Sequence, residues 1–165
     1  MRLFSAETGD SIGPRVSSER TVYSVAWSPD GKTLAVGDGD LRCGSIQLYK
    51  LVTTETGDSL RAFASARAHR SFLRSVAWSP CGKMLASGGD DKMLYTFDAR
   101  TGEVRPLASH ADFVWSVAWS PCGKLLASGG DGKVIYLWDA ETGQARCELR
   151  AHRCESPLFP FTKTK

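Results

Sequence analysis

Three histidines, His69, His110 and His152, recur at nearly equal spacing and are the residues of this sequence most suited to chemistry. Histidine acts as a general base and as a metal ligand, so a shared ion or a catalytic centre is one interpretation. Cys147 and Cys154 flank the last histidine, but their spacing matches no standard zinc pattern and no second ligand pair follows. The regular recurrence instead indicates equivalent structural positions, so we expect neither a metal nor a cofactor.

Other residue types that enzymes use stand in turns. Gly31–Thr33 has the form that ends a phosphate-binding loop, but Ala26 stands where the first glycine of such a loop must be. The serines of the Ser-Pro pairs form no nucleophile elbow. We therefore predict that the protein is not an enzyme, because no nucleophile, base or carboxylate pair is placed for catalysis.

The composition is that of a globular protein: 165 residues, 42% of them apolar, with a net charge of +3. The charge is spread along the chain without a basic block, which gives no basis for nucleic-acid binding. An odd number of cysteines without an export signal indicates reduced thiols. Since no apolar stretch is long enough to span a membrane, we expect a cytoplasmic or nuclear protein.

The string Ser-Val-Ala-Trp-Ser-Pro occurs three times, at Ser24–Pro29, Ser75–Pro80 and Ser116–Pro121. Trp78 and Trp119 are 41 residues apart, within the roughly 40 to 45 residues of a four-stranded propeller blade. Trp27 and Trp78 are 51 residues apart. The first repeat therefore carries an insertion of about ten residues relative to that period.

Each repeat contains four short predicted strands and no convincing helical period. In the third repeat the turns are expected at Pro121–Lys124 and Gly129–Gly132, where proline fixes φ and glycine accepts positive φ. The strands between and around these turns are predicted at Val114–Ser120, Leu125–Ser128, Val134–Asp139 and Gln144–Arg150.

Two dipeptides recur in register with these units. A Trp-Asp pair ends the third repeat at Trp138–Asp139 and becomes Phe97–Asp98 and Tyr49–Lys50 in the others. A small residue and a histidine precede the repeats or follow the last one, at Ala68–His69, Ser109–His110 and Ala151–His152. This pattern resembles the WD40 repeat family over most of the chain. The resemblance implies an all-β fold, an incomplete β-propeller of three four-stranded antiparallel blades preceded by an N-terminal half-blade stub. It also implies a non-enzymatic scaffold for protein-protein interaction.

The stub is predicted because Leu3–Gly9 aligns with Leu137–Gly143, the end of a repeat. Its strands are expected to be the third and fourth of a preceding blade. The boundaries expected along the chain are the stub at 1–17, the first repeat with its insertion at 18–68, the second at 69–109, the third at 110–151, and a non-repeat tail without strands at 152–165.

The family resemblance further implies a buried hydrogen-bond network in each blade. It joins the opening histidine, a serine on the second strand, an aspartate in the following turn and the tryptophan, and it rigidifies a blade when every member is satisfied. The second repeat supplies His69, Ser87 and Asp91 but has Phe97 in place of the tryptophan.

The other two networks are also incomplete. The third repeat supplies His110, Ser128 and Trp138 but has Gly132 at the aspartate position. The first repeat departs most, replacing both the histidine and the serine, with Ser18 and Val36. We therefore expect modest stability.

Three blades and a stub do not close a ring, because propellers have at least about four blades. Three explanations stay open: a truncated chain that lacks further blades, a ring completed by another chain, or an open arc. In each case uncovered strand edges and blade surfaces favour self-association.

By the same resemblance, partner contacts lie three and five residues after the position of the opening histidine. These positions are Thr21 and Tyr23, Phe72 and Arg74, and Phe113 and Trp115. Tyrosine, tryptophan and arginine are enriched among interface hot spots, so we expect Tyr23, Arg74 and Trp115 to be exposed contacts with proteins or peptides. The alternative is a reader of a peptide modification or RNA, in which Arg74 and its neighbours hold an anionic or methylated side chain.

Overall fold

A computed structural model of the chain describes residues 3–12, 18–54, 57–150 and 153–154. Among these residues there is no α-helix, and hence none long and apolar enough to cross a membrane. The strands are β1 (Leu3–Phe4), β2 (Ser11–Ile12), β3 (Thr21–Trp27), β4 (Thr33–Gly39), β5 (Gly44–Thr54), β6 (Gly57–His69), β7 (Leu73–Trp78), β8 (Met84–Gly89), β9 (Met93–Asp98), β10 (Val104–Ser109), β11 (Val114–Trp119), β12 (Leu125–Gly130), β13 (Val134–Asp139), β14 (Ala145–Arg150) and β15 (Arg153–Cys154).

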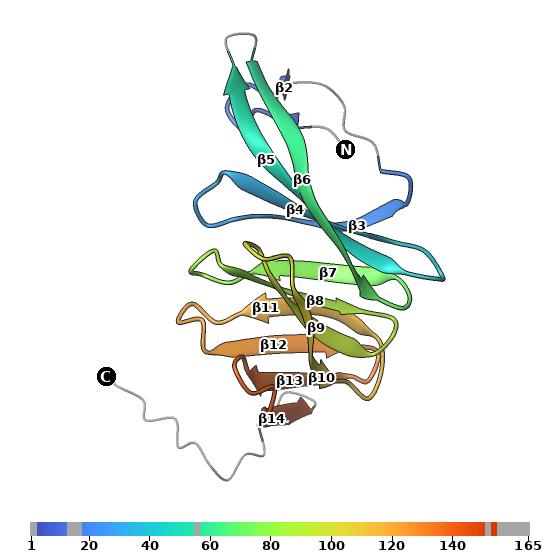
Figure 1. Cartoon of the computed structure of the whole chain (residues 1–165). Helices are drawn as coiled ribbons and strands as arrows, with labels where there is room; N and C mark the ends of the chain where they lie inside the picture. The colour runs from blue at the N-terminus through green and yellow to red at the C-terminus, as the bar shows by residue number, and fades with distance from the viewer. Residues whose placement is uncertain (1–2, 13–17, 55–56, 151–152, 155–165) are drawn as a thin grey trace, which may run out of the picture.

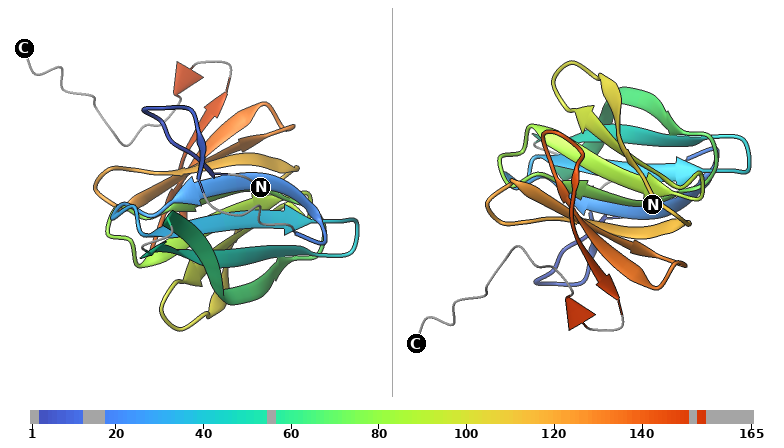
Figure 2. Two further views of the ribbon diagram at one scale, coloured as in Figure 1. Left: turned by 90° about the horizontal axis from the view of Figure 1, so that it is seen from above. Right: turned by 90° about the horizontal axis from the view of Figure 1, so that it is seen from below.

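Three antiparallel sheets stack face to face, each built from consecutive strands (Figure 1). The first blade is β3–β6, the second is β7–β10, and the third is β11–β14 with β15 added at its outer edge. In the view from above the first blade is nearest the viewer, and in the view from below the third blade is nearest (Figure 2). The all-β fold of three four-stranded antiparallel blades is confirmed.

The N-terminal segment forms a small antiparallel hairpin, in which Leu3 pairs with Ile12 and Phe4 pairs with Ser11. Leu3 packs against a buried cluster of Leu34, Val36 and Tyr49 on the first blade. Two adjacent strands lying against that blade are what a half-blade stub would provide.

The strand β15 was not expected from the sequence, which predicted a tail without strands. Arg153 and Cys154 pair with Arg150 and Leu149 on β14. A pairing this short uses backbone groups at an open sheet edge and needs no alternation of side chains, so no sequence signal announced it.

The insertion in the first repeat lengthens its outer hairpin. Strands β5 and β6 contain 11 and 13 residues, whereas β9 and β10 contain 6 residues each. The longer hairpin rises beyond the other strands at the top of the stack (Figure 1). Inserted residues in an antiparallel pair add ladder hydrogen bonds instead of disturbing the sheet.

The turns follow the sequence with one correction. Gly123 adopts φ 72 and donates its N–H to the Ser120 carbonyl at 2.9 Å, as the Pro-Cys-Gly-Lys turn requires. The glycines predicted to begin the next turn, Gly129 and Gly130, instead continue β12. Gly129 pairs with Ser116 and Ile135, and Gly130 pairs with Val114, so both belong to the sheet. Only Gly130 is required by close packing, because a Cβ there would collide with the Phe113 carbonyl.

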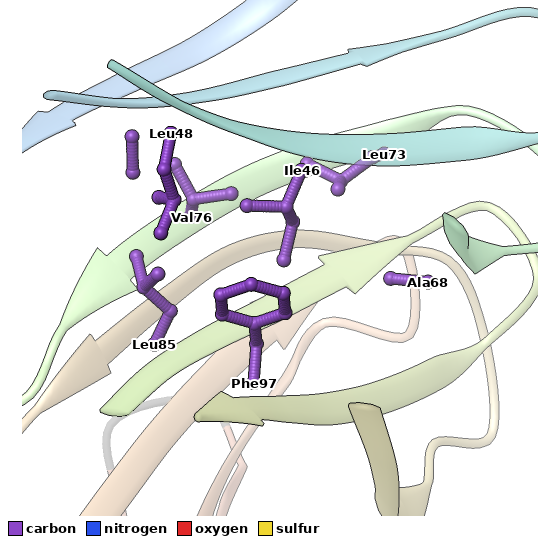
Figure 3. Close-up of a cluster of buried hydrophobic side chains, with 8 residues drawn as sticks. Ile46, Leu48, Ala68, Leu73, Val76, Leu85 and Phe97 are labelled. Atoms are coloured by element: carbon purple, nitrogen blue, oxygen red, sulfur yellow. The ribbon is translucent and has the colours of Figure 1, made fainter. Parts of the chain in front are cut away.

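The core lies between the blades. Residues of β5 and β6 in the first blade meet residues of β7, β8 and β9 in the second, all buried (Figure 3); the labelled members are Ile46, Leu48, Ala68, Leu73, Val76, Leu85 and Phe97. An equivalent cluster joins the second and third blades, with Leu94, Val114 and Trp138 among its members. Burial of apolar side chains between sheets therefore holds the stack together.

The recurring Ser-Val-Ala-Trp string connects each blade to the one before it. The indole Nε1 of Trp78 donates to the Ala26 carbonyl at 3.0 Å, and the backbone N–H of Val76 donates to Ser24 Oγ at 3.1 Å. The third blade repeats both bonds one period later, to Ala77 at 3.1 Å and Ser75 at 3.2 Å. The second copy of the string is thus a donor to the first blade and an acceptor for the third.

Candidate protein-interaction face

The first strands of the three blades share a bulge near their beginning. The register shifts between Val22 and Ser24 in β3, and between the equivalent residues of β7 and β11. The bulged residues are Tyr23, Arg74 and Trp115. A bulge leaves one residue outside the ladder and redirects its side chain, so these positions are free to project from the sheet.

Arg74 lies at the centre of the surface that these residues form. Its guanidinium carbon is 4.9 Å from the ring centroid of Tyr23, 4.9 Å from that of Phe72 and 5.2 Å from that of Trp115. Tyr23 and Phe72 also meet edge to face, with centroids 5.5 Å apart. Residues from three blades are thereby brought into one cluster through cation–π contacts.

The charge of Arg74 is already paired. Its Nε and Nη2 donate to the two carboxylate oxygens of Asp90 at 2.7 and 2.5 Å. These hydrogen bonds to Asp90 raise the pKa of Arg74, so the guanidinium stays charged. A bidentate pair of this kind fixes the plane of the guanidinium and holds it against the rings.

The aromatic side chains around this arginine are open to solvent. Trp115 is 50% exposed, Tyr23 36% and Phe113 37%, while Phe72 is half-buried. Lys92 Nζ lies 5.8 Å from the Phe113 ring centroid. We call the surface formed by Thr21, Tyr23, Phe72, Arg74, Phe113 and Trp115 the aromatic face.

His69 has the hydrogen-bond order of a catalytic triad without its accessibility. Its Nδ1 lies 2.7 Å from Asp91 Oδ1 and its Nε2 lies 2.9 Å from Ser87 Oγ. Burial raises the pKa of Asp91, but the hydrogen bond and charge of His69 together with the backbone N–H groups of Arg70 and Met93 outweigh it, so this pKa is lowered. In serine hydrolases such an order activates the hydroxyl for attack on a substrate. Here Ser87 is fully buried and His69 is 3% exposed, so the three side chains brace the second blade.

In the third blade, the equivalent histidine and serine are not hydrogen-bonded to each other, and the tryptophan bonds to the serine instead. Trp138 Nε1 donates to Ser128 Oγ at 2.7 Å. His110 is buried, yet neither of its ring nitrogens has a hydrogen-bond partner. Its ring instead packs edge-on against Tyr136, with centroids 4.6 Å apart. The structure therefore joins Ser128 and Trp138 and leaves His110 outside the network, because Gly132 supplies no carboxylate to orient it.

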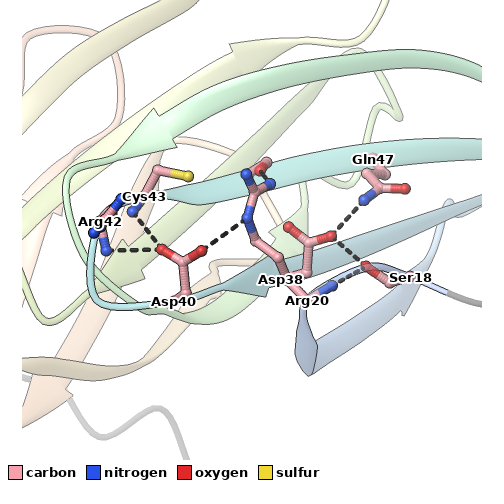
Figure 4. Close-up of polar contacts among 8 residues, drawn as sticks. Ser18, Arg20, Asp38, Asp40, Arg42, Cys43 and Gln47 are labelled. Carbon is pink, nitrogen blue, oxygen red and sulfur yellow. Dashed lines mark hydrogen bonds and ion pairs between the residues drawn. The ribbon is translucent and has the colours of Figure 1, made fainter.

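The first blade builds a network that the sequence did not reveal (Figure 4). Asp38 is completely buried and accepts hydrogen bonds from Ser18 Oγ at 2.7 Å and from Gln47 Nε2. Tyr49 Oη donates to Gln47 Oε1 at 2.6 Å. Ser18 thus takes over the role of the missing histidine, with Asp38 as the shared acceptor.

A signal for this substitute network was present in the alignment of the repeats. Asp38 stands where the second and third blades have Gly89 and Gly130, and an acidic residue inside a strand needs partners. Gln47 occupies the position of Tyr95, which makes it the partner at hand.

Metal binding finds no support in the part of the chain that the structure describes, where no three His, Cys, Asp or Glu side chains are grouped to hold an ion. Of the sequence candidates, Cys147 is half-buried on β14, His152 lies outside the described residues, and the side chain of Cys154 is not described.

A comparison with protein families matches the model described as "WD domain, G-beta repeat" at residues 14–49, 59–98 and 102–139. The three matches cover the larger part of each blade. Each match ends in the third strand of a blade, within β5 or at the last residue of β9 or β13.

Curated relatives are similar over about half of this chain. Protein hir1 of Emericella nidulans is 40% identical over 92 residues, which are 53% of this chain and 8% of that protein. Probable cytosolic iron-sulfur protein assembly protein 1 of Malassezia globosa is 36% identical over 50% of this chain and 24% of that protein. Meiotic recombination protein rec14 of Schizosaccharomyces pombe is 38% identical over 48% of this chain and 23% of that protein. The chain thus spans less than a quarter of each of these relatives.

Proposed function

Because this chain belongs to the WD40 repeat family, we propose that it is a scaffold without catalytic activity of its own, which binds other proteins or peptides through the aromatic face. The observation that carries this proposal is the position of Arg74, held by Asp90 between rings contributed by neighbouring blades.

The energetics of the aromatic face favour a protein partner. Tyrosine, tryptophan and arginine account for many interface hot spots, and the two aromatic residues bury large areas while losing few rotamers on binding. Arg74 is already fixed by its carboxylate partner, so ordering it costs little when a partner arrives. Trp115 offers the largest exposed ring for such a contact.

The pairing of Arg74 argues against the reader alternative. An anionic modification is attracted less strongly here, because the Asp90 carboxylate already offsets the guanidinium charge and accepts from two of its five N–H donors, at Nε and Nη2. A methylated lysine needs an empty aromatic cage, whereas Arg74 itself lies against Tyr23 and Trp115. Whether RNA bases stack on Trp115 is decided by the capture experiment described below.

The names of the relatives support a cytosolic or nuclear location. One is named as a cytosolic assembly protein and another as a meiotic recombination protein. We propose the same compartments for this chain, and we assign it none of the activities of those much longer proteins.

The test is a capture experiment with peptide and RNA libraries on immobilised protein, comparing the wild type with Trp115→Ala. We expect peptides to be retained by the wild type, and Trp115→Ala to weaken their binding by at least about 1 kcal/mol at an unchanged melting temperature. Phe63→Ala is the matched control, since Phe63 is 52% exposed on β6 and does not belong to the aromatic face.

Two results contradict the proposal. Retention of RNA alone would favour the reader alternative. Equal loss of binding in Trp115→Ala and Phe63→Ala would place the contact elsewhere. Arg74→Ala is a poorer probe, because it strands the Asp90 side chain, which is 10% exposed, and so lowers stability as well.

A further inference from the structure

The interface between consecutive blades has three recurring parts. A side chain near the start of the first strand fills a space above a glycine of the previous blade: Leu73 lies over Gly37, and Val114 lies over Gly88. A Cβ on either glycine would collide with that side chain. The backbone bond to serine and the indole bond to an alanine carbonyl, described above, are the other two parts.

The outward surface of the first blade presents the donor half of this interface. Val22, equivalent to Leu73, is 36% exposed, whereas Leu73 is completely buried. Val25 is 53% exposed, whereas its equivalent Val76 is 6% exposed. Trp27, whose counterparts donate to alanine carbonyls, is 44% exposed. Strand β3 therefore carries an unused copy of the surface that β7 and β11 bury.

The outward surface of the third blade presents the acceptor half. At Gly129, the equivalent of Gly37 and Gly88, the only atom of the described residues that a Cβ would meet is Ile135 Cγ1, at 3.8 Å, so no described side chain fills the space above it. Ile135 is 48% exposed, whereas Ile46, its equivalent in the first blade, is completely buried.

The polar acceptors of that half are exposed as well. Ser116 and Ala118 are exposed on β11, whereas their equivalents in β3 and β7 are half-buried beneath the next blade. In both interfaces within the chain, the equivalent serine hydroxyl accepts from a valine N–H and the equivalent alanine carbonyl accepts from a tryptophan indole.

We propose that the third blade of one copy of this chain binds the first blade of a second copy, repeating the interface between consecutive blades. Val22 fills the space above Gly129, the N–H of Val25 bonds to Ser116, and the indole of Trp27 bonds to the Ala118 carbonyl. The contact is heterologous, since two different surfaces meet, and it either closes into a ring or extends.

A second copy is the occupant because both halves belong to one sequence and match part for part. The acceptor half offers isoleucine and leucine at Ile135 and Leu137, the same residues that Ile46 and Leu48 offer to the second blade. The interface within the chain has therefore already demonstrated the fit between these side chains and a following first strand.

The N-terminal hairpin competes for the same surface. Leu3, which aligns with Leu137 in the repeat, packs on the Leu34, Val36 and Tyr49 cluster of the first blade. In the proposed contact Leu137 of the incoming copy takes that place, so the hairpin β1–β2 moves aside. Its two-residue strands make this displacement inexpensive.

The first test fills the open space with Gly129→Val and follows the mass of the full chain by sedimentation equilibrium at micromolar concentrations. We expect the wild type to exceed 17.9 kDa as concentration rises. We expect the variant to raise the dissociation constant at least about tenfold at an unchanged melting temperature, because the added methyl groups occupy the place of Val22.

Two controls frame this variant. Gly88→Val makes the same change where Val114 already occupies the space, so it should lower the melting temperature strongly. Leu41→Ser removes a side chain that is 78% exposed elsewhere and should leave association unchanged.

The second test distinguishes head-to-tail contact from other association. Val25→Asp blocks the donor half, and Gly129→Val blocks the acceptor half. Each variant alone should stay monomeric, and an equimolar mixture should form a one-to-one complex through the intact halves. Leu3→Asp, which loosens the hairpin, should strengthen association of the wild type but not of Gly129→Val.

The proposal is overturned by any of three results: a wild type and a Leu3→Asp variant that both remain monomeric, Gly129→Val associating as the wild type does, or a mixture that yields no complex. None of these results bears on the aromatic face, which Trp115→Ala tests separately.

Discussion

The second and third blades each have an opening histidine and, 18 residues later, a buried serine, and they use these residues in different ways. In the second, His69 is hydrogen-bonded through both ring nitrogens, to Asp91 and Ser87. In the third, His110 has no such bond, and Ser128 is bonded to Trp138 instead. Both serines are buried and both have a partner.

The difference shows that the buried serine, more than the histidine, determines the network. A buried hydroxyl without a partner costs about 1 to 3 kcal/mol, so each blade satisfies it with whichever donor or acceptor its sequence supplies. The aspartate orients the histidine toward the serine in the second blade. Without an aspartate, the tryptophan takes over in the third.

The largest expected effect separates the two histidines. His69→Ala leaves Asp91 and Ser87 buried without their partner and should lower the free energy of unfolding by about 3 kcal/mol. His110→Ala loses ring packing but also removes two unsatisfied buried nitrogens, so its loss should be about half as large. Urea unfolding of both variants measures the difference. Equal losses would mean that the hydrogen bonds of His69 contribute nothing.

A smaller effect is expected when the tryptophan is removed from the third blade. Trp138→Phe makes this blade resemble the second, but Ser128 then has neither an indole nor an oriented histidine as partner. We expect the free energy of unfolding to fall by about 2 kcal/mol. Adding Ser128→Ala to this variant should recover part of the loss, since no buried hydroxyl remains. A double variant as unstable as the sum of both changes would contradict the central role of the serine.

Gly132→Asp should convert the third blade toward the second by supplying the missing carboxylate. Gly132 does not have a positive φ, and its Cβ would meet only Asp112 Cβ at 3.7 Å, so the position accepts a side chain. A hydrogen bond to His110 and the lower entropy of the unfolded chain should raise stability by about 1 kcal/mol. Gly129→Ala, on the same blade, gains only the entropic part and serves as control.

The smallest effect is a pH dependence carried by His110. Burial lowers its pKa from 6.5, and the neighbouring Asp112 opposes this shift only in part. The unfolded chain therefore binds the proton more tightly than the folded one. This contribution to stability is complete above the unfolded pKa, and stability falls as the pH drops below it. Melting temperatures at about pH 7.5 and 5.5 should show the decline, and His110→Gln should reduce it.

Most of the fold could be predicted from the sequence because the sequence contains three repeats. Three copies of one string, with proline and glycine at fixed turn positions, predicted the strands, their order and the extra length of the first repeat. The predicted end of β12 was wrong because Gly129 and Gly130 signal a turn locally, whereas both pair within the sheet and close packing against the Phe113 carbonyl requires the second of them.

The candidate site stays a prediction; Tyr23 and Trp115 are exposed as expected, whereas Arg74 is half-buried between them. Spacing from the histidine brought Tyr23, Arg74 and Trp115 onto one surface. That spacing could not reveal Asp90 as the partner of Arg74, because consecutive aspartates in a turn carry no signal of which one reaches a neighbouring strand. In the first blade the replacement of a glycine by Asp38 did carry a signal, which comparison of the repeats at Gln47 and Tyr95 could have used.

The tryptophan-to-alanine bonds between blades also bear on the order in which this protein folds. Trp78 reaches a carbonyl 52 residues earlier, and Trp119 one 42 residues earlier. A ribosome produces each acceptor strand before the strand that binds it, so every new blade meets a completed surface as it emerges. We expect folding to advance vectorially from the first blade, each sheet acting as the template for its successor and sparing the chain a search among its similar strands.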